Sequence, residues 1–163
     1  MSCFNYIVKF YELNGYTLTV DSLQDNKYRY KCSTSGIQSN FSHFVASIKH
    51  EGQLFEFEIQ HNLAVQSSHH EEIFTTPDIS IVKKNQVITT TEYYDSNKRF
   101  SYITNSDLMS FCEVKQFNPF PELLFNFIGV INELQKDIMT NIEIKHVPIH
   151  IAPSLMISGK PNK

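Results

Sequence analysis

The sequence predicts one α/β or α+β domain in which helices flank a mixed central β-sheet. Two helix-like segments, with several strand-like runs between and after them, carry this prediction. The chain has 163 residues, which is enough for one domain with a hydrophobic core. We therefore expect residues 1–163 to form a single domain.

The N-terminal half predicts one helix followed by strands. Apolar residues recur at helical spacing over residues 3–13, and Asn14-Gly15 is typical of a helix end. Alternating or apolar runs predict strands over residues 16–20, 28–32, 41–48 and 54–59, the last continuing through 63–65. The HEGQ segment at residues 50–53 predicts a hairpin turn between two of these strands.

The C-terminal half predicts further strands around one long helix. Strand-like runs cover residues 77–82, 87–94 and 110–117, and proline at the start of the first is tolerated there. An amphipathic helix is predicted over residues 120–139, and a last strand over 154–158. The apolar stripe of the predicted helix comprises Phe120, Leu123, Leu124, Phe127, Val130, Ile131, Leu134 and Ile138. The chain ends soon after a strand, so we expect the C-terminus to be either a truncation point, from which a helix is missing, or a flexible tail.

The composition predicts a folded protein of the cell interior. The chain is 41% hydrophobic, and its formal net charge of −3 gives no general attraction to nucleic acid or acidic membranes. The three cysteines (Cys3, Cys32 and Cys112) form no CxxC motif, which favours a reducing compartment over a disulfide scaffold or zinc ribbon. Neither a signal-peptide pattern nor a membrane-spanning run is found, so we expect a soluble cytoplasmic protein without a membrane partner.

Two charged residues, Glu113 and Lys115, stand inside an apolar strand-like run. Side chains two residues apart project from the same face of a strand, so these two would lie side by side. A carboxylate and an ammonium are costly to bury in a sheet, which marks the pair as a candidate functional site. Asp78 opens another apolar run upstream and could join them if the two strands pair.

The three side chains have the chemistry for hydrolysis of a phosphodiester. Asp78 and Glu113 could chelate one hard divalent cation, whose shell would be completed by waters and substrate phosphate. Lys115 would then orient or deprotonate an attacking water, or neutralise the charge that develops on the phosphate.

These residues resemble the motif of the PD-(D/E)XK nuclease superfamily. Pro77-Asp78 matches its PD half, and Glu113-Val114-Lys115 matches its (D/E)XK half. The family core runs helix, three strands, helix, strand, and the predicted order here is similar. The resemblance therefore implies a restriction-endonuclease-like core, in which the aromatic and basic hairpin between the two motif halves would be an insertion.

The resemblance also implies an activity: Mg²⁺- or Mn²⁺-dependent cleavage of nucleic acid, of DNA rather than RNA. It further implies an upstream acidic metal ligand. Glu58 is favoured because its strand should neighbour that of Asp78, while Glu12 on the first helix and Glu72 on the connecting loop remain alternatives. The resemblance suggests an endonuclease acting in restriction or anti-phage defence, with a homodimer or partner protein helping to bind the substrate.

Each part of the motif also has a structural interpretation. Asp78 after proline is typical of a turn, and Glu113 and Lys115 fit a solvent-facing pair at a sheet edge, which contributes little energy. A second hypothesis is therefore a non-catalytic, nuclease-like binding or assembly module without metal affinity. The HHEE run at residues 69–72 lacks zinc-type spacing and predicts a solvated loop.

The densest positive charge of the sequence lies at Lys98 and Arg99, in a predicted loop. These residues, together with Lys83, Lys84 and Lys145, could contact a phosphate backbone or serve as ordinary solubilising charges.

Overall fold

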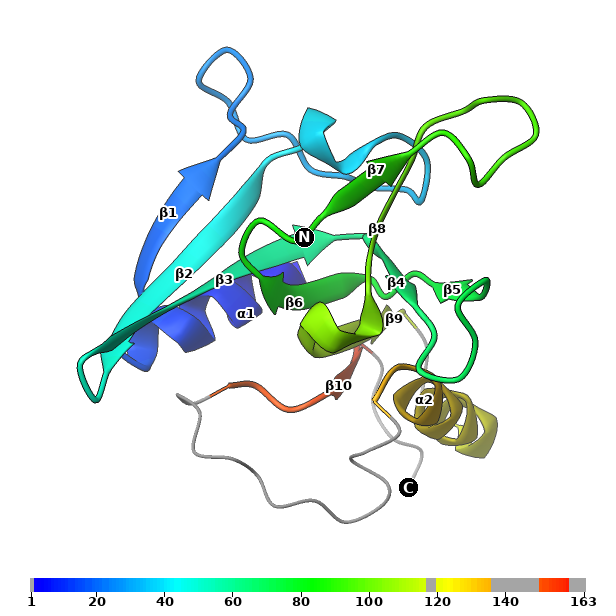
Figure 1. The fold of residues 1–163 in the computed structure, drawn as a ribbon. Helices are drawn as coiled ribbons and strands as arrows, with labels where there is room; N and C mark the ends of the chain where they lie inside the picture. The colour runs from blue at the N-terminus through cyan, green and yellow to red at the C-terminus, as the bar shows by residue number, and fades with distance from the viewer. Residues whose placement is uncertain (1, 117–119, 136–149, 159–163) are drawn as a thin grey trace.

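The fold is α+β, with two mixed β-sheets and two α-helices in the part of the chain that the structure describes (Figure 1). The computed structural model describes residues 2–116, 120–135 and 150–158. The larger sheet has six strands and the smaller one four. The α+β form of the predicted class is therefore confirmed.

The six-stranded sheet contains the segments that carry the candidate site. Its strands, in spatial order, are β1 (Thr17–Asp21), β2 (His43–His50), β3 (Gln53–His61), β6 (Ile79–Lys83), β9 (Leu108–Lys115) and β10 (Ser154–Ile157). Neighbouring strands are antiparallel, except that β9 and β10 run parallel. Strands β6 and β9 are interior, so a strand pairs with each of them on both sides.

The four-stranded sheet lies beyond the end of β3. Its strands, in spatial order, are β5 (Phe74–Thr75), β4 (Ala64–Gln66), β8 (Phe100–Ile103) and β7 (Ile88–Thr90). Two short 3-10 helices lie in connections, η1 (Gln38–Asn40) and η2 (Asn105–Asp107). The chain leaves β3 at Asn62, whose φ of 43° lies in the left-handed region that asparagine tolerates. The predicted continuation of one strand through residues 63–65 is therefore wrong.

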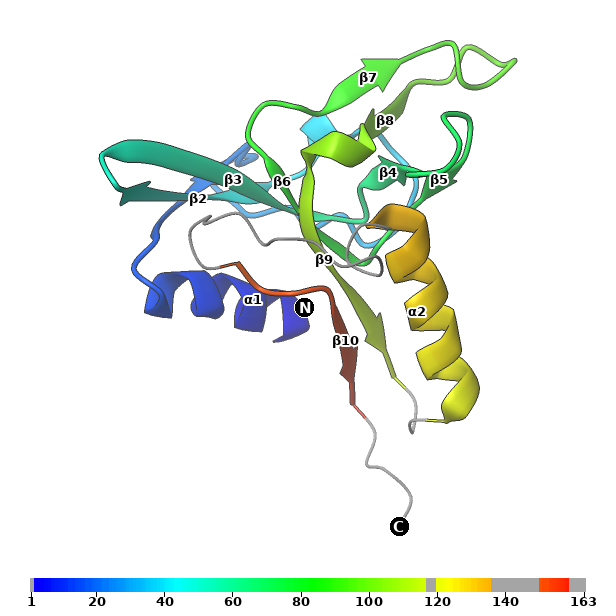
Figure 2. The same ribbon diagram turned by 60° about the horizontal axis from the view of Figure 1, so that its bottom comes forward.

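Helix α1 (Ser2–Leu13) covers one face of the larger sheet, as the apolar spacing of residues 3–13 predicted (Figure 2). Phe4, Ile7 and Tyr11 are fully or almost fully buried in the core cluster that also contains Ile79 and Ile81 of β6. Burying one such side chain contributes about 1.5–3 kcal/mol. This packing holds the start of β6 in place.

Helix α2 (Pro121–Leu134) packs on the opposite face of β9. Its residues Phe127, Ile131 and Leu134 join a second core cluster with Phe111 of β9. Successive side chains of a strand alternate between faces, so Phe111 points to α2 while Cys112 belongs to the α1 cluster. The sheet around β9 is therefore covered on both sides.

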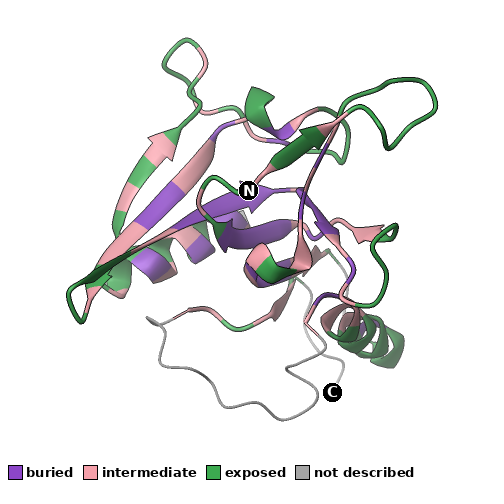
Figure 3. Ribbon diagram, in the orientation of Figure 1, coloured by how far each residue is buried: buried purple, intermediate pink, exposed green. Residues whose placement is uncertain are grey.

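The predicted apolar stripe of the long helix is only partly buried (Figure 3). Leu123 and Leu134 are buried, whereas Phe120 and Leu124 are 46% and 53% exposed. Phe120 is the N-cap residue of α2 and Leu124 lies near the start of the helix, so both exposed side chains belong to its N-terminal end. The predicted helical residues 136–139 lie outside the described residues.

The strand predicted over residues 28–32 does not form. The segment is tethered through Ser42: its N–H donates to the carbonyl of Arg29 at 2.9 Å, and its hydroxyl accepts the N–H of Arg29 at 2.9 Å. Tyr30 still packs edge-on against Phe4, with ring centroids 6.1 Å apart. The alternation of this segment therefore reflects burial of its tyrosines and not a strand ladder.

Two other predicted strands have different bounds. The β-branched and aromatic run at residues 87–94 forms only β7, which leaves Tyr93 and Tyr94 in the connection to β8. The strand predicted over residues 110–117 forms as β9, while Phe117 lies outside the described residues. The remaining strands form close to their predicted positions.

The β2–β3 hairpin confirms the turn predicted at residues 50–53. His50 pairs with Gln53, so two residues form the loop, and both have positive φ: 49° at Glu51 and 81° at Gly52. This combination is the I′ turn, whose twist matches that of antiparallel strands. The turn needs left-handed backbone at its second position, where glycine has no steric penalty.

Replacing Gly52 with alanine is expected to lower the free energy of unfolding by about 1–2 kcal/mol, because alanine is strained at this φ. The matched control is Gly129→Ala within α2, which should raise stability by about 1 kcal/mol through helix propensity. A Cβ at either position would meet nothing within 4 Å, so the two changes differ only in backbone conformation. Urea denaturation of both variants measures the effect, and changes of the same sign would contradict the turn assignment.

Candidate functional site

The carboxylate of Asp78 lies at the start of β6 and faces β9. The last backbone pair between these strands joins Ile79 to Cys112. One step further, the N–H of Val114 donates to Oδ2 of Asp78 at 2.7 Å. Beyond the last backbone pair, the side chain of Asp78 therefore accepts the hydrogen bond from β9. This bond fixes the orientation of its carboxylate.

Glu113 and Lys115 project from the same face of β9, as strand alternation predicted. The ammonium of Lys115 lies 2.7 Å from Oε2 of Glu113 and 3.6 Å from Oδ2 of Asp78. Asp78 and Lys115 are about one-third exposed, at 37% and 35% of their side-chain surface, whereas the Glu113 side chain is 12% exposed. The structure thus brings the three predicted residues together at a partly open position.

The charges of this set are strongly coupled. Burial raises the pKa of Glu113, and the hydrogen bond and charge of Lys115 offset this only in part, while the nearby Asp78 carboxylate raises it further. Burial lowers the pKa of Lys115, but the hydrogen bond and charge of Glu113, together with Asp78, outweigh it and leave the pKa raised. Lys115 is therefore held in its protonated form.

Two carboxylates at this position suit a hard divalent cation. Hydrogen bonds from the backbone and from Lys115 reach only Oδ2 of Asp78 and Oε2 of Glu113 within the described ranges, so each carboxylate retains a second oxygen. Those ranges contain no cluster of three or more His, Cys, Asp or Glu side chains that could hold a metal. Mg²⁺ commonly binds through one or two carboxylates and keeps several waters, so the pair fits Mg²⁺ or Mn²⁺ and not a closed zinc site.

The structure does not place Glu58 beside Asp78. Glu58 pairs with Val82 across β3 and β6, four residues or about 13 Å along the strand from Asp78. Its side chain is buried, with Oε1 accepting the N–H of Asn85 at 2.8 Å and Oε2 accepting the amide of Gln60 at 2.9 Å. Oε1 thus holds the turn after β6 and Oε2 is bound within β3, so the expected third ligand is not provided by this residue.

The two alternatives for the third acidic residue also lie apart from the set. Glu12 is exposed near the end of α1 and pairs with Lys9 at 2.7 Å. Glu72 is exposed in the turn between β4 and β5, and its N–H donates to Nδ1 of His70 at 3.2 Å. As far as the structure describes the chain, neither forms a metal-binding group with Asp78 and Glu113.

Sequence reasoning missed Lys31, which lies on the other side of Asp78. A cavity of about 370 Å³ is lined by both residues. Lys31 is buried and donates to Oε1 of Gln38 and to the carbonyl of Asn62, each at 2.9 Å. Asn62 in turn donates its N–H to the carbonyl of Asp78 at 3.2 Å. A lysine between Tyr30 and Cys32 in an alternating run gave no signal of this position.

Burial of the Lys31 ammonium lowers its pKa to about 8. This value is still above neutral pH, so the group is predominantly a cation there. Lys31 therefore adds a second positive charge near Asp78, on a different element from Lys115.

Comparisons with family models, with characterised proteins and with solved structures find no match for the chain. No helix in the described part of the chain is long and apolar enough to cross a membrane. The function is therefore inferred from the geometry of the site.

Proposed function

We propose that the chain is a metal-dependent nuclease domain that hydrolyses phosphodiester bonds in nucleic acid. The observation that carries the proposal is the convergence of Asp78, Glu113 and Lys115 from two neighbouring interior strands. Two carboxylates, each with an oxygen that neither the backbone nor Lys115 occupies, and one ammonium within 4 Å of both suit a divalent cation and a phosphate.

The order of elements supports this proposal. Helix α1, strands β3, β6 and β9, helix α2 and strand β10 follow the order helix, three strands, helix, strand. This is the order of the PD-(D/E)XK core that the motif resembles, with the proposed metal ligands at the start of β6 and within β9. Strands β1, β2, β4, β5, β7 and β8 would then be additions to that core.

The residues of the site have distinct proposed roles. Asp78 and Glu113 would hold Mg²⁺ or Mn²⁺, which when bound would stabilise negative charge on the phosphate. The hydrogen bond from Val114 keeps the Asp78 carboxylate facing β9. Lys115, whose pKa is raised, is better suited to neutralise charge on the phosphate than to accept a proton from water.

One observation favours the alternative of a non-catalytic binding or assembly module. Lys115 already neutralises part of the charge of Asp78 and Glu113, and Asp78 also accepts a hydrogen bond from the backbone. Such a network can stabilise a sheet without binding a metal.

For the nuclease we propose DNA as substrate and the cytoplasm as location, with restriction or anti-phage defence as its setting, as the family resemblance implies.

The test combines metal binding with cleavage. Isothermal titration with Mn²⁺ should detect binding that Asp78→Asn weakens at least about tenfold, because the change removes one of only two charged ligands. The control Asp25→Asn, in an exposed turn, should leave binding unchanged. The wild-type protein should cleave plasmid DNA or a single-stranded oligonucleotide with Mg²⁺ or Mn²⁺, and EDTA should stop the cleavage. Absence of both metal binding and cleavage would favour the module.

A further inference from the structure

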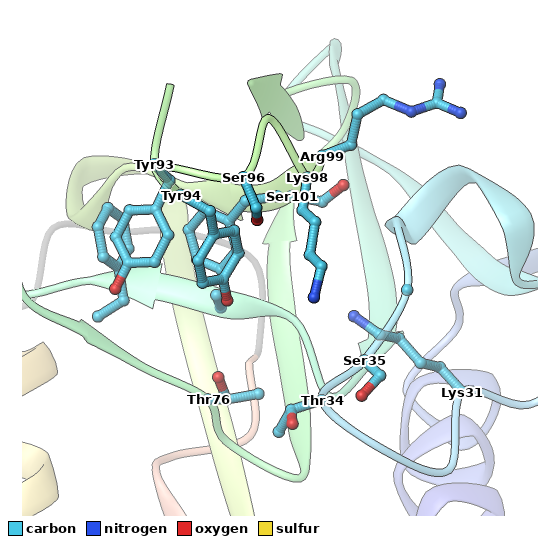
Figure 4. Close-up of a pocket in the computed structure, with 14 residues that line it drawn as sticks. Lys31, Thr34, Ser35, Thr76, Tyr93, Tyr94, Ser96, Lys98, Arg99 and Ser101 are labelled. Atoms are coloured by element: carbon cyan, nitrogen blue, oxygen red, sulfur yellow. The ribbon is translucent and has the colours of Figure 1, made fainter. Parts of the chain in front are cut away.

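A second, larger cavity lies on the four-stranded sheet, next to the candidate site. It has a volume of about 600 Å³ and is formed by the loop before η1, the start of β4 and the loop between β7 and β8 (Figure 4). Its lining combines aromatic rings, cations and hydroxyl groups. Neither core cluster includes the aromatic residues of this cavity. These rings therefore need an explanation other than the packing of the main core.

The aromatic side of the cavity is a cluster around Phe100. Tyr93 stacks on Phe100 with ring centroids 4.2 Å apart and an interplanar angle of 19°, and Phe74 contacts Phe100 edge-on at 5.1 Å. Tyr94 makes only edge-on contacts with Tyr93 and Phe100 in the part of the chain that is described. Tyr93 and Tyr94 are each 44% exposed. Tyr94 thus offers a supported ring to which a further planar group can stack.

The opposite side of the cavity is basic. Lys31 and Lys98 extend toward one another across it, while Arg99 points away at the rim (Figure 4). The described residues that line the cavity include no carboxylate, so its charge is positive although the chain as a whole carries −3. Two of the three hydrogens of the Lys31 ammonium have acceptors within the described residues, which leaves one for a ligand.

Hydroxyl groups complete the lining. Thr34, Ser35 and Thr76 lie on the side of the cavity that faces the tyrosine hydroxyls (Figure 4). An aromatic platform opposed by cations and hydroxyls is the combination that binds an unpaired nucleotide, since the base stacks while phosphate and sugar take the polar groups. A duplex buries its bases in stacking and could not offer a free base face to Tyr94.

The cavity is continuous with the candidate site along the chain. Lys31 lines both this cavity and the one that contains Asp78. Thr76 precedes Asp78 by two residues, or about 7 Å of extended chain. This is about two steps at the 3.4 Å rise per nucleotide of duplex DNA, and fewer in a more extended single strand. A strand held in the cavity would therefore reach Asp78 within a few nucleotides.

We infer that this cavity binds an unpaired nucleotide of a nucleic-acid strand, stacked on Tyr94 with its phosphate between Lys31 and Lys98. The inference rests on the proposed nuclease function and specifies its substrate: a single-stranded or locally unpaired nucleic acid. Stacking on Tyr94 is tolerant of base identity, so no sequence preference is expected from the cavity. The two lysines supply the affinity for phosphate that the net charge of the chain does not.

The test is fluorescence anisotropy with a labelled 12-nucleotide thymidine strand and with a 12-base-pair duplex, both in EDTA to prevent cleavage. The single strand should bind at least about tenfold more tightly than the duplex. Tyr94→Ala should weaken single-strand binding about 5- to 150-fold. Lys98→Gln should reduce the slope of log affinity against log salt by about 0.7, the value for one lost phosphate contact.

Matched controls exist on distant elements. Tyr6→Ala removes a tyrosine that is 69% exposed on α1, and Lys49→Gln removes an exposed lysine on β2. Both should leave binding within about twofold of the wild-type value. Equal effects of Tyr94→Ala and Tyr6→Ala would overturn the inference, and so would equal affinity for duplex and single strand. If thymidine monophosphate competes as well as the 12-nucleotide strand, the ligand is a free nucleotide and the inference that the cavity binds a strand is wrong.

The outcome also separates this inference from the proposed function. If Tyr94→Ala retains metal-dependent cleavage and binds the strand as tightly as the wild-type protein, the nuclease proposal stands. The inference that the cavity binds the substrate is then wrong. Tyr94-dependent strand binding without cleavage in Mg²⁺ or Mn²⁺ would support the cavity and exclude the nuclease. If the protein shows neither Tyr94-dependent strand binding nor metal-dependent cleavage, both the cavity inference and the nuclease proposal are overturned.

Discussion

Replacing Lys115 with alanine is expected to lower kcat for metal-dependent cleavage about 100- to 1,000-fold. This is the loss typical of removing one group that stabilises charge in a transition state. The pKa of Lys115 is raised by the hydrogen bond and charge of Glu113 and by the charge of Asp78, so the ammonium persists near neutral pH and can face a phosphate oxygen. The measurement is single-turnover cleavage of a labelled oligonucleotide in saturating Mg²⁺.

Lys83→Ala provides the matched control for this change. Lys83 ends β6 and forms an ion pair with Asp107 at 3.2 Å, so it is also a paired lysine on an interior strand of the same sheet. Its loss should leave kcat unchanged, and both variants should unfold at similar urea concentrations. Lys115→Arg should recover part of the activity, because it restores the charge with a different shape. A Lys115→Ala protein as active as the Lys83→Ala protein would remove Lys115 from the mechanism.

Acidification from pH 7 to pH 5 is expected to cost the protein about 2 kcal/mol of stability through His61 alone. Burial lowers the pKa of this imidazole from 6.5 to about 4. Between these values the unfolded chain binds a proton that the folded protein does not, so the free energy of unfolding falls as the pH falls through this window. At pH 5 the difference spans about 1.5 pH units at about 1.36 kcal/mol each. Below pH 4 both states are protonated and the loss is complete.

The packing of His61 explains why it stays neutral. Its ring stacks on Phe4 with centroids 3.6 Å apart, Tyr30 lies edge-on at 5.2 Å, and its Nε2 is buried without a hydrogen-bond partner in the described structure. His61→Phe keeps an aromatic ring on Phe4 and removes the titration, so it should flatten the pH dependence by about 2 kcal/mol between pH 7 and pH 5. Urea unfolding at the two pH values measures this difference.

His50→Gln is the control for that experiment. His50 is 43% exposed at the β2–β3 hairpin, so its replacement controls for the loss of a histidine outside the core. His150, whose pKa is also lowered to about 4 by burial, should supply the acid sensitivity that remains in His61→Phe. Equal pH dependence of wild type and His61→Phe would show that the folded state does not hold His61 neutral.

The period of a strand was sufficient to predict part of the site. Glu113 and Lys115 are two residues apart in an apolar run, so their common face followed from backbone geometry. Placing Asp78 beside them required the two strands to pair, and β6 and β9 do pair. The turn at Gly52 and helix α1 were equally local features, and they also form where predicted.

Register explains why the prediction for Glu58 did not hold. Its strand does neighbour that of Asp78, as expected, but neighbouring strands can pair in many registers. In the register that forms, His61 lies opposite Ile79. The residue that contacts Asp78 is therefore Asn62, directly after β3. Nothing in the local pattern of residues 54–59 specifies this offset, which depends on packing across the whole sheet.

The second cavity could not be predicted because its parts are distant in sequence and locally misleading. Tyr93 and Tyr94 lie in a β-branched, aromatic run that predicts a strand, yet they leave the ladder and cluster around Phe100. Lys31 belongs to a run that also predicted a strand, and only the tertiary fold brings it opposite Lys98 (Figure 4). Tertiary contacts here override local propensity.

Because the backbone amide of Val114 donates a hydrogen bond to Asp78, its NMR signal reports on the state of the site. An N–H that donates to a carboxylate senses the charge on that carboxylate, so the amide resonance of Val114 in a nitrogen–proton correlation spectrum should move when Asp78 is protonated or gains a ligand. The amide of Ile81, further along β6 and paired with Ser110 of β9, provides a reference on the same strand. Spectroscopy on a single backbone position can thus follow occupancy of the site without any substrate.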